Sequence, residues 1–320
     1  MALYDRSKII FGLAKESTRG TANDTISRYI AIDRGLTMDY VLSLIEDTQL
    51  RGQVYNIPPI TGIKTGTGTI RFNVEAGNIG ELLYSLLGNV TSEQQGQTSA
   101  YKHTFIRSNS NQLQSYTIHI DWGIAKKKYV RSCIKSITFS VTPDGVLLAD
   151  ISLLFEKEDS STVTFNPSWS TPKPLMGYQV AIENPDGEIV TNVKDLSITI
   201  DNQNFAKRVL KQSQDIDDIL AIGPLLVNGS FTVYFESLTE RNNFLSNTAS
   251  SLELKLEGQT IEGAYKETFD ILLPEIHYTA YPFGEADGLL ASAVTFNAYQ
   301  KLSDGSNQVT VYIINNITSY

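Results

Sequence analysis

Strict alternation of apolar and polar side chains is the feature of this sequence that most limits its fold. In residues 116–121 (YTIHID), Tyr116, Ile118 and Ile120 point to one side of an extended chain and the intervening residues to the other. The same period of two recurs in residues 137–141, 147–155, 196–200 and 252–256. Gly beside Asp or Asn marks turns at 144–145, 228–229, 287–288 and 304–305. The pattern predicts a mainly β protein, with antiparallel sheets in a sandwich or barrel.

Two segments have a clear helical pattern instead. Residues 78–87 place most of their Ile and Leu side chains on one face, and Gly88 is expected to end this helix. A second helix is expected over residues 239–246, and a weaker helical pattern covers residues 212–220. Helices are therefore a minor part of the predicted fold.

The strands that precede the two helices resemble each other. Residues 68–75 read GTIRFNVE, and residues 229–236 read GSFTVYFE. Farther along, DGVLLA at 144–149 resembles DGLLAS at 287–292, so the order of strand, helix, strands and Asp-Gly hairpin is kept. This predicts two copies of one β-rich unit. The Pro-, Ser- and Thr-rich stretch 156–174 marks the boundary, which gives a first domain of residues 1–172, with an N-terminal arm of residues 1–22, and a second domain of residues 173–320.

Composition excludes several classes of protein. With 26 Lys and Arg against 35 Asp and Glu, the net charge is −9, whereas sequence-independent DNA binding needs a basic surface. A single cysteine, Cys133, rules out an intramolecular disulfide framework, and three histidines leave little for a zinc site. No stretch has the roughly 18 to 20 apolar residues of a membrane helix, and the N-terminal residues lack the apolar core of a secretory signal. We expect a soluble protein made in a cytoplasm.

The residues that catalysis would need are mostly absent. The Gly-rich stretch 62–68 (GIKTGTG) lacks the order of a phosphate-binding loop and is interpreted as a hairpin or flexible loop. The acidic stretch 215–218 is interpreted as a solvated loop or helix start. His119 and His277 are expected at the surface or in an interface, and Cys133 is expected to be buried. No enzymatic activity, metal or cofactor is predicted.

One basic cluster, Lys126, Lys127 and Lys128, lies beside Tyr129. Nucleic-acid contact is one interpretation of such a cluster. A solvated hairpin tip, or contact with an acidic patch on a neighbouring subunit, is favoured because the chain as a whole is acidic. These lysines are therefore candidates for a subunit contact.

Three segments resemble the tail tube (major tail) proteins of long-tailed bacteriophages. They are residues 12–22 (GLAKESTRGTA), residues 194–202 (KDLSITIDN), and a closing set formed by residues 273–278, 287–291 and 296–298. The order and spacing of these segments, together with the repeat, carry the resemblance. The family has no catalytic signature, so the resemblance assigns no active-site residue.

The resemblance implies a structural virion protein of the two-domain type. Each tube domain would be a β-sandwich with a flanking helix, and strands of neighbouring subunits would join in a shared inner β-barrel. Trimeric rings of pseudo-sixfold symmetry would stack into the hollow tube of a flexible, siphophage-type tail, through which the double-stranded genome is ejected into the bacterial host without specific binding. The implied partners are other copies of the chain, the tape-measure protein, the distal tail or baseplate proteins and the tail terminator.

Repulsion of phosphates in such a tube would require acidic side chains along the bore. Glu75, Glu236, Glu253 and Glu257 are predicted on polar strand faces and are the candidate lumen carboxylates. Residues 88–101, 156–174 and 309–320 are expected to be long loops that contact the next ring. The alternative is another β-rich virion component, such as a distal tail protein, a tube terminator or an adhesin module.

Overall fold

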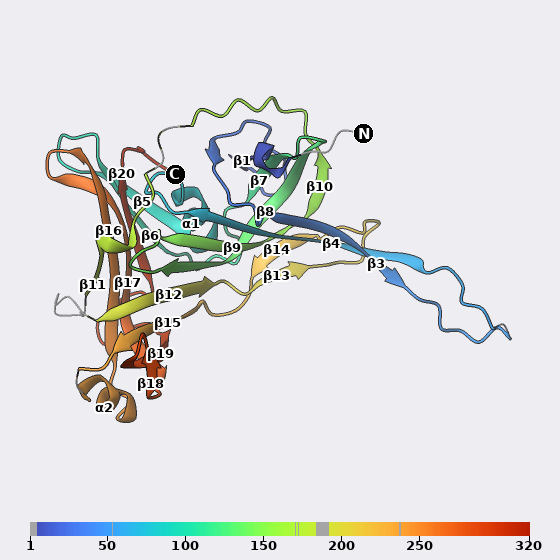
Figure 1. Ribbon diagram of the computed structural model, residues 1–320. Coiled ribbons are helices and arrows are strands. Elements are labelled where there is room, and N and C mark those ends of the chain that lie inside the picture. The colour runs from blue at the N-terminus through green and yellow to red at the C-terminus, as the bar shows by residue number, and fades with distance from the viewer. Residues whose placement is uncertain (1–4, 53, 170, 172, 184–191, 237) are drawn as a thin grey trace.

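Antiparallel strands make up most of the molecule (Figure 1). The computed structural model describes residues 5–52, 54–169, 171, 173–183, 192–236 and 238–320. The mainly β class and the two helices predicted from the sequence are confirmed: α1 spans Gly80–Leu87, and α2 spans Thr239–Leu245. Short 3₁₀ turns lie at Arg6–Lys8 and Gly177–Gln179.

The first half of the chain supplies ten of the described strands. They are β1 (Ile10–Lys15), β2 (Arg28–Ile30), β3 (Thr37–Ile45), β4 (Ile60–Asn73), β5 (Gly88–Gln94), β6 (Tyr101–Arg107), β7 (Tyr116–Asp121), β8 (Lys126–Val141), β9 (Leu148–Phe155) and β10 (Lys157–Ser160). The second half supplies β11 (Val180–Glu183), β12 (Val193–Asp201), β13 (Asn204–Lys207), β14 (Asp218–Ala221), β15 (Leu226–Tyr234), β16 (Ser250–Glu262), β17 (Tyr265–Ala280), β18 (Gly284–Ala286), β19 (Leu289–Ala298) and β20 (Thr310–Asn315).

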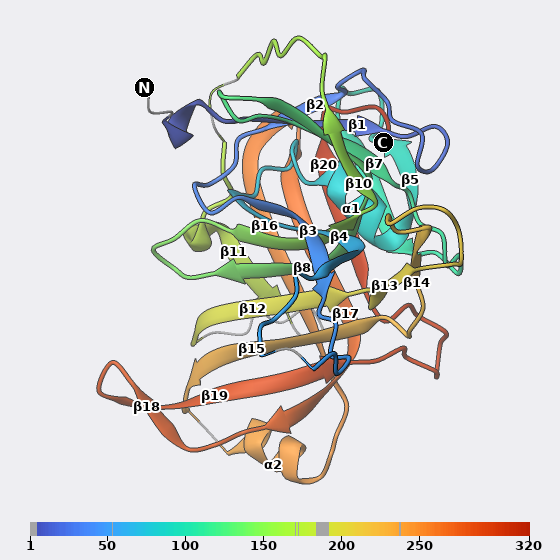
Figure 2. The ribbon, with the colours of Figure 1, turned by 90° about the vertical axis from the view of Figure 1, so that its right-hand side faces the viewer.

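One layer of the fold is a continuous sheet built by both halves. Its strands pair in the order β3–β4–β9–β8–β12–β15–β19, and β19 then pairs with β18 and with the end of β17. Figure 2 shows β8, β12, β15 and β19 lying side by side. The pairing of β8 with β12 therefore joins the first half of the chain to the second without a break in the sheet.

The other layer has one part from each half. In the first half the order is β2–β1–β7–β8–β10, and in the second it is β11–β16–β17–β20–β6–β5. The long strands β8 and β17 belong to both layers, because each pairs with different neighbours along its two halves. The β5–β6 hairpin of the first half completes the layer of the second half.

The two halves repeat the same order of pairing. β3–β4–β9–β8 in the first half corresponds to β12–β15–β19–β17 in the second. In the other layer, β1–β7–β8–β10 corresponds to β11–β16–β17–β20. Each helix follows the corresponding strand, β4 or β15. The repeat seen in the sequence thus has a counterpart in strand topology.

The layers enclose one continuous apolar core that draws on both halves. Phe139 of β8 lies 5.0 Å from Phe269 of β17, measured between ring centroids, so aromatic packing crosses from one half to the other. α1 is almost fully buried in this core, and Gly88 ends it in a left-handed conformation, as expected.

The turn predicted at residues 228–229 is wrong, and residues 62–68, interpreted as a hairpin or flexible loop, are not a loop but one strand of the β3–β4 hairpin. Residues 62–68 lie within β4, and residues 228–229 lie within β15. A Cβ at Gly66 would come within 2.4 Å of the Phe155 ring, and one at Gly229 would come within 2.5 Å of the Ser197 carbonyl oxygen. Glycine is used here because neighbouring groups approach the backbone closely, not because the chain turns.

Other loop and helix assignments also differ from the structure. Residues 212–220 are not helical and end in β14, which pairs with β13. Half of the segment 88–101 is the strand β5, and the segment 309–320 contains β20. The expected N-terminal arm is integrated in its own chain, since β1 pairs with β7. Pro172, at the expected domain boundary, lies outside the described residues.

A buried carboxylate fixes the point where β8 passes from one layer to the other. Arg131 has a left-handed backbone conformation (φ 52°) within β8, and its N–H donates to Glu16 Oε1 at 2.8 Å. Glu16 is 3% exposed and also accepts hydrogen bonds from the Thr117 and Ser115 hydroxyls and the Gly20 N–H. One side chain thereby links the end of β1, β7 and the bend in β8.

Substitution Glu16→Ala should lower the free energy of unfolding by about 3–5 kcal/mol, because several buried donors lose their acceptor. Urea unfolding followed by circular dichroism measures this. The matched control is Glu93→Ala on β5, where the side chain is exposed and we expect a change within about 0.5 kcal/mol. Equal effects of the two substitutions would contradict the assigned role of Glu16.

Candidate assembly surfaces

The face of the continuous sheet that points away from the core is lined by small polar side chains. Hydroxyl pairs connect adjacent strands across it: Thr37 with Thr69 at 2.7 Å, Thr138 with Thr199 at 2.9 Å, and Thr279 with Thr295 at 2.7 Å. Arg71 of β4 forms two hydrogen bonds with Asp150 of β9, beside a hollow of about 360 Å³. This polar sheet face is shared by both halves of the chain.

The β3–β4 hairpin carries an apolar surface far from the core. It projects well beyond the rest of the molecule, with residues 46–52 and 54–59 toward its tip (Figure 1). Leu44 is 60% exposed and Ile45 is 56% exposed, and more large apolar side chains of this arm are exposed: Val41, Leu42, Leu50, Val54, Tyr55, Ile57, Ile60 and Ile63. An apolar patch of this kind marks an interaction site. Sequence analysis missed it, although the apolar cluster at 41–45 interrupts the alternating pattern.

The base of the arm is held by the segment between β13 and β14. Arg208 donates to the Lys64 carbonyl oxygen at 2.7 Å and to the Thr65 hydroxyl at 2.8 Å. The Lys64 N–H donates to the Gln214 carbonyl oxygen at 3.0 Å. The Tyr40 hydroxyl donates to Asp215 Oδ1 at 2.5 Å, and burial and this carboxylate together raise the pKa of Tyr40. A segment of the second half thus positions an arm of the first.

An ionic cluster attaches this segment to the first half. Arg19 Nη2 lies 2.9 Å from Asp218 Oδ1, and Arg131 Nη1 lies 3.2 Å from the same atom. Burial alone would raise the pKa of Asp218, but the hydrogen bonds from Arg19, the Ile219 N–H and Gln112, together with the charge of Arg19, outweigh it, and the pKa lies below its usual value. Gly20 has φ 77°, and a Cβ there would meet the Arg131 guanidinium. The segment 12–22 therefore orders the strands around it.

The four candidate lumen carboxylates lie in different places. Glu253 and Glu257 are on β16 in the other layer, and Glu257 pairs with Lys266 at 2.8 Å and Lys255 at 3.1 Å. Glu75 follows β4 and accepts a hydrogen bond from the Lys173 N–H at 3.1 Å. Glu236 follows β15 and is exposed. The structure does not bring the four together on one surface.

The three lysines begin β8 and have partners within the chain. Lys127 Nζ lies 2.6 Å from Glu158 Oε1, and Lys128 Nζ lies 2.9 Å from Asp24 Oδ1. Lys126 lies over the Phe165 ring, at 5.5 Å from its centroid. Intramolecular contacts therefore account for this basic cluster within one chain.

His119 is fully buried, which corrects the prediction of a surface or interface histidine. Its ring nitrogens bond to the Ser161 hydroxyl at 2.9 Å and the Asn23 carbonyl oxygen at 2.8 Å, and burial lowers its pKa. Because both neighbours lie far away in sequence, alternation alone could not reveal them. Cys133 is buried as predicted, and burial raises the pKa of its thiol to about 12, which makes the thiolate scarce.

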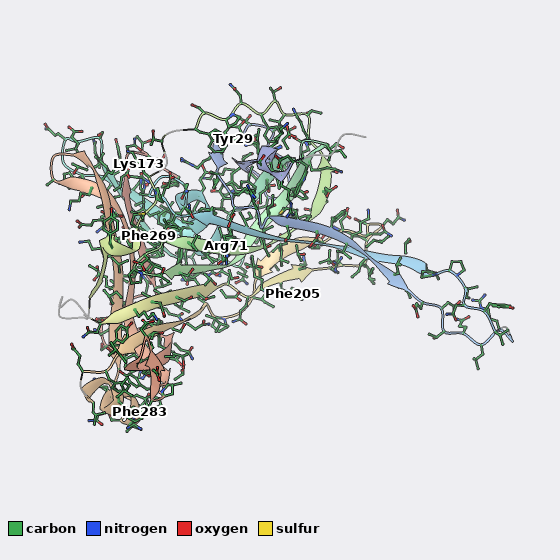
Figure 3. All side chains as sticks on the ribbon, viewed as in Figure 1. Tyr29, Arg71, Lys173, Phe205, Phe269 and Phe283 are labelled. Carbon is green, nitrogen blue, oxygen red and sulfur yellow. The ribbon has the colours of Figure 1, made fainter. Side chains whose placement is uncertain are left out.

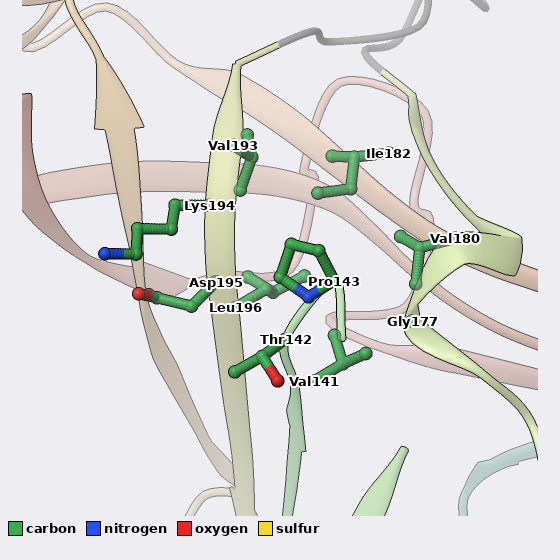
Figure 4. A pocket seen from close by; sticks show the side chains of 10 residues that line it. All are labelled: Val141, Thr142, Pro143, Gly177, Val180, Ile182, Val193, Lys194, Asp195 and Leu196. Atoms are coloured by element: carbon green, nitrogen blue, oxygen red, sulfur yellow. The ribbon is translucent and has the colours of Figure 1, made fainter. Parts of the chain in front are cut away.

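The cavities described among the placed residues bring together no group of catalytic side chains. One of about 50 Å³ lies where β8 ends beside β12, lined largely by apolar residues such as Val141, Val180 and Leu196 (Figure 4). Lys194 points away from it and pairs with Asp287 at 2.7 Å. Within the described ranges, no three His, Cys, Asp or Glu side chains are grouped so that they could hold a metal ion. No helix in the described part of the chain is long and apolar enough to cross a membrane.

Comparison with protein families agrees with this picture of a β-rich protein. The family model for phage tail tube proteins matches residues 6–298. The chain belongs to the phage tail tube protein family. A search of curated proteins found no match. Membership implies that this tail tube protein has a structural role in the virion. It also implies that the protein assembles with copies of itself into a tube and has partners in the phage tail.

One carboxyl group of the tail tube protein is poorly solvated. Asp270 of β17 is 9% exposed, faces Glu253 and Lys255 of β16 and Tyr312 of β20, and its Oδ1 has no hydrogen-bond partner among the described residues. Burial, followed by the negative charge of Glu253, raises the pKa of Asp270 from 3.8 to about 8, although Lys255 and Lys102 oppose the shift. The folded chain therefore favours the protonated form.

Stability should fall as pH rises from about 4 to about 8 and level off above, because in this range the folded chain keeps a proton on Asp270 that the unfolded chain has already lost. Substitution Asp270→Asn should remove this loss. We expect the variant to exceed the parent in stability by more than about 1.4 kcal/mol near pH 9, the value of one pKa unit, and to approach it near pH 4. Urea unfolding across this range measures the difference.

The control is Asp150→Asn on the polar sheet face, where the exposed carboxylate is paired with Arg71. This variant should gain no stability at high pH. Parallel pH profiles of the parent and Asp270→Asn would contradict the assignment of a protonated Asp270.

Proposed function

We propose that this tail tube protein polymerises as stacked rings into a hollow tube, the conduit through which the phage genome is ejected into the host. The observation that supports this most is the continuous sheet, which has two repeated halves, a polar face and an unpaired strand edge at each end within the described residues. A single chain leaves such edges open, and closure into a ring of subunits removes them. The polar face then lines the bore of a shared β-barrel.

We further propose two fused tube domains, residues 1–172 and 173–320. The repeated order of strand pairing and the helix that follows β4 or β15 support this division. If each domain occupies one equivalent position in the ring, three chains supply six positions. The assembly is then a trimer with pseudo-sixfold symmetry, as in a flexible siphophage tail.

The β3–β4 arm is proposed to contact the next ring. Its exposed Leu and Ile side chains would leave water on contact, and each buried side chain contributes about 1.5–3 kcal/mol. Contacts that repeat from ring to ring propagate, whereas contacts within a ring close on themselves. The lysines at 126–128 remain candidates for a contact between subunits.

The tube is proposed to pass double-stranded DNA without binding it. Hydroxyl-lined strands offer phosphates few fixed cations, since Arg71 on this face is already paired with Asp150, and the charge of −9 on each chain is multiplied around the ring. Of the four predicted lumen carboxylates, Glu75 and Glu236 follow strands of the continuous sheet and fit this bore, whereas Glu253 and Glu257 lie on β16 in the other layer and do not line it. The proposed partners are the tape-measure protein, the distal tail or baseplate proteins and the terminator, with synthesis in the bacterial cytoplasm before assembly.

Negative-stain electron microscopy of the purified protein, at low and high concentration, tests the proposal. Hollow tubes of stacked rings with threefold symmetry are expected, either spontaneously or after addition of a nucleating tail tip. Closed rings that never extend would contradict the proposal and favour a terminator or distal tail protein.

Substitution Leu44→Asp in the arm should prevent stacking and leave the subunit folded, because Leu44 is exposed and its replacement changes stability by only about 0.5 kcal/mol. Light scattering measures assembly, and circular dichroism measures folding. The matched control is Ile124→Asp in the β7–β8 turn, where the side chain is 70% exposed and assembly should continue. Tubes formed equally well by both variants would remove the arm from the assembly.

A further inference from the structure

The chain contains, within itself, a junction between two copies of the same kind of sheet. β8 ends the first-half part of the continuous sheet, and β12 begins the second-half part. They pair antiparallel over six residues, with Ile137 opposite Ile200 and Phe139 opposite Ile198. The core-facing side chains of both strands therefore meet on one side of the junction, and Thr138 and Thr199 meet on the other.

The correspondence between the halves can be fixed residue by residue. Gly68 of β4 is opposite Met38 of β3, just as Gly229 of β15 is opposite Ile198 of β12. A Cβ at Gly68 would meet Leu153 and the Thr37 carbonyl oxygen, and a Cβ at Gly229 would meet their counterparts, Phe296 and the Ser197 carbonyl oxygen. Met38 thus corresponds to Ile198, and by the same register Tyr40 corresponds to Ile200.

The other side of the junction is fixed by a β-bulge. β8 shifts register against β9 between Ile134 and Ser136, and β17 shifts in the same way against β19 between Tyr278 and Ala280. Continuing from the bulge, Ile137 corresponds to Tyr281 and Phe139 to Phe283. In the second half these residues lead from β17 into β18, and this segment is an end of the continuous sheet.

We propose that β3 of one copy pairs antiparallel with residues 280–285 of a second copy, in the register of the β8–β12 junction. Tyr40 then lies opposite Tyr281, and Met38 lies opposite Phe283. This inference rests on the proposed tube and names the strands that join its subunits side by side. The occupant of each open edge is another copy of this chain.

The chemistry of the two edges supports this register. Met38 and Tyr40 are the residues of β3 that pack against the core, and Tyr281 and Phe283 are in aromatic contact with Phe235. The core-facing sides of both strands therefore coincide, as they do within the chain. If the register between the two copies shifted by one residue, Tyr40 would lie opposite a residue whose side chain belongs to the polar face.

The exposure of apolar side chains at the two edges also supports pairing between copies. Phe283 is 54% exposed and Val41 is 58% exposed in the single chain, so pairing has apolar surface to cover. The edges lie at different ends of the molecule, since β3 leads into the arm and Phe283 lies beside α2 (Figures 1 and 3). A head-to-tail contact between copies is therefore geometrically open to every subunit of a ring.

Pro282 departs from the internal template in a way that affects backbone pairing. It takes the place of Thr138 and would lie opposite Asp39, and it has no N–H to donate. Proline on an edge strand limits uncontrolled pairing. The junction between copies should therefore have fewer backbone hydrogen bonds than the β8–β12 junction, which suits a contact that forms only on assembly.

Cysteine cross-linking between singly substituted chains tests the register. Opposed residues have Cβ atoms about 4.5–5.5 Å apart, within reach of a disulfide after small shifts. Val41→Cys on one chain should cross-link to Ala280→Cys on another, and Thr37→Cys to Gly284→Cys. The crossed combinations, Val41 with Gly284 and Thr37 with Ala280, use the same four positions but are displaced by about 13 Å along the strand.

The variants are mixed in pairs, with one partner lengthened by a tag, and are assembled, oxidised mildly and separated on a non-reducing gel. Matched pairs should give at least about ten-fold more heterodimer than crossed pairs, and only in assembled material. Cys133 is buried and should not interfere.

The outcomes distinguish a failure of the proposed junction from a failure of the proposed tube. Tubes in which crossed pairs link as well as matched ones, or in which no pair links, overturn the junction and leave the proposed function intact. Failure to assemble under any nucleating condition overturns both. Hydrogen exchange gives a second measurement that needs no substitution, since the amides of residues 37–41 should gain protection in tubes, and equal protection in free subunits would also overturn the junction.

Discussion

The Glu16 carboxylate is the interaction on which the architecture of the first half depends. β8 can serve two layers only if its backbone turns sharply between them, and Arg131 makes that turn in a conformation that non-glycine residues rarely adopt. The bond from the Arg131 N–H to Glu16 satisfies a donor that the turn removes from the ladder. The same carboxylate holds Gly20, whose lack of a side chain leaves room for the Arg131 guanidinium.

The two halves are interlocked rather than merely linked. β12 continues the sheet of the first half, while β6 from the first half pairs with β20 from the second. Arg19 and Asp218 add a charged contact between the halves, and Phe139 and Phe269 add an aromatic one. The position of one open edge is therefore defined relative to the other, as regular side-by-side contacts between subunits require.

Local sequence patterns predicted those strands and helices that are determined by the burial of one face of a short segment. Alternation in residues 116–121 and the apolar face of residues 78–87 were sufficient for a strand and for α1, because burial of one face determines each element. The glycines at 66 and 229 were interpreted as parts of loops or turns, but they lie in strands where side chains and carbonyl groups of neighbouring strands approach the backbone closely. His119 was misplaced for a similar reason, since its partners Asn23 and Ser161 come from distant segments. The apolar arm was missed because its large apolar side chains stay exposed in the single chain, so burial within the chain imposes no regular pattern on them.

The sharing of β8 between two layers has a mechanical consequence. Its sixteen residues are bonded laterally to β7, β10, β9 and β12, and in antiparallel ladders these bonds run perpendicular to the strand. A pull along β8 therefore loads many hydrogen bonds in shear at once, so that none can break ahead of the others as in a zipper. Such a strand resists extension far better than it resists peeling, which makes the molecule stiff along β8 and weakest at its outer strand edges.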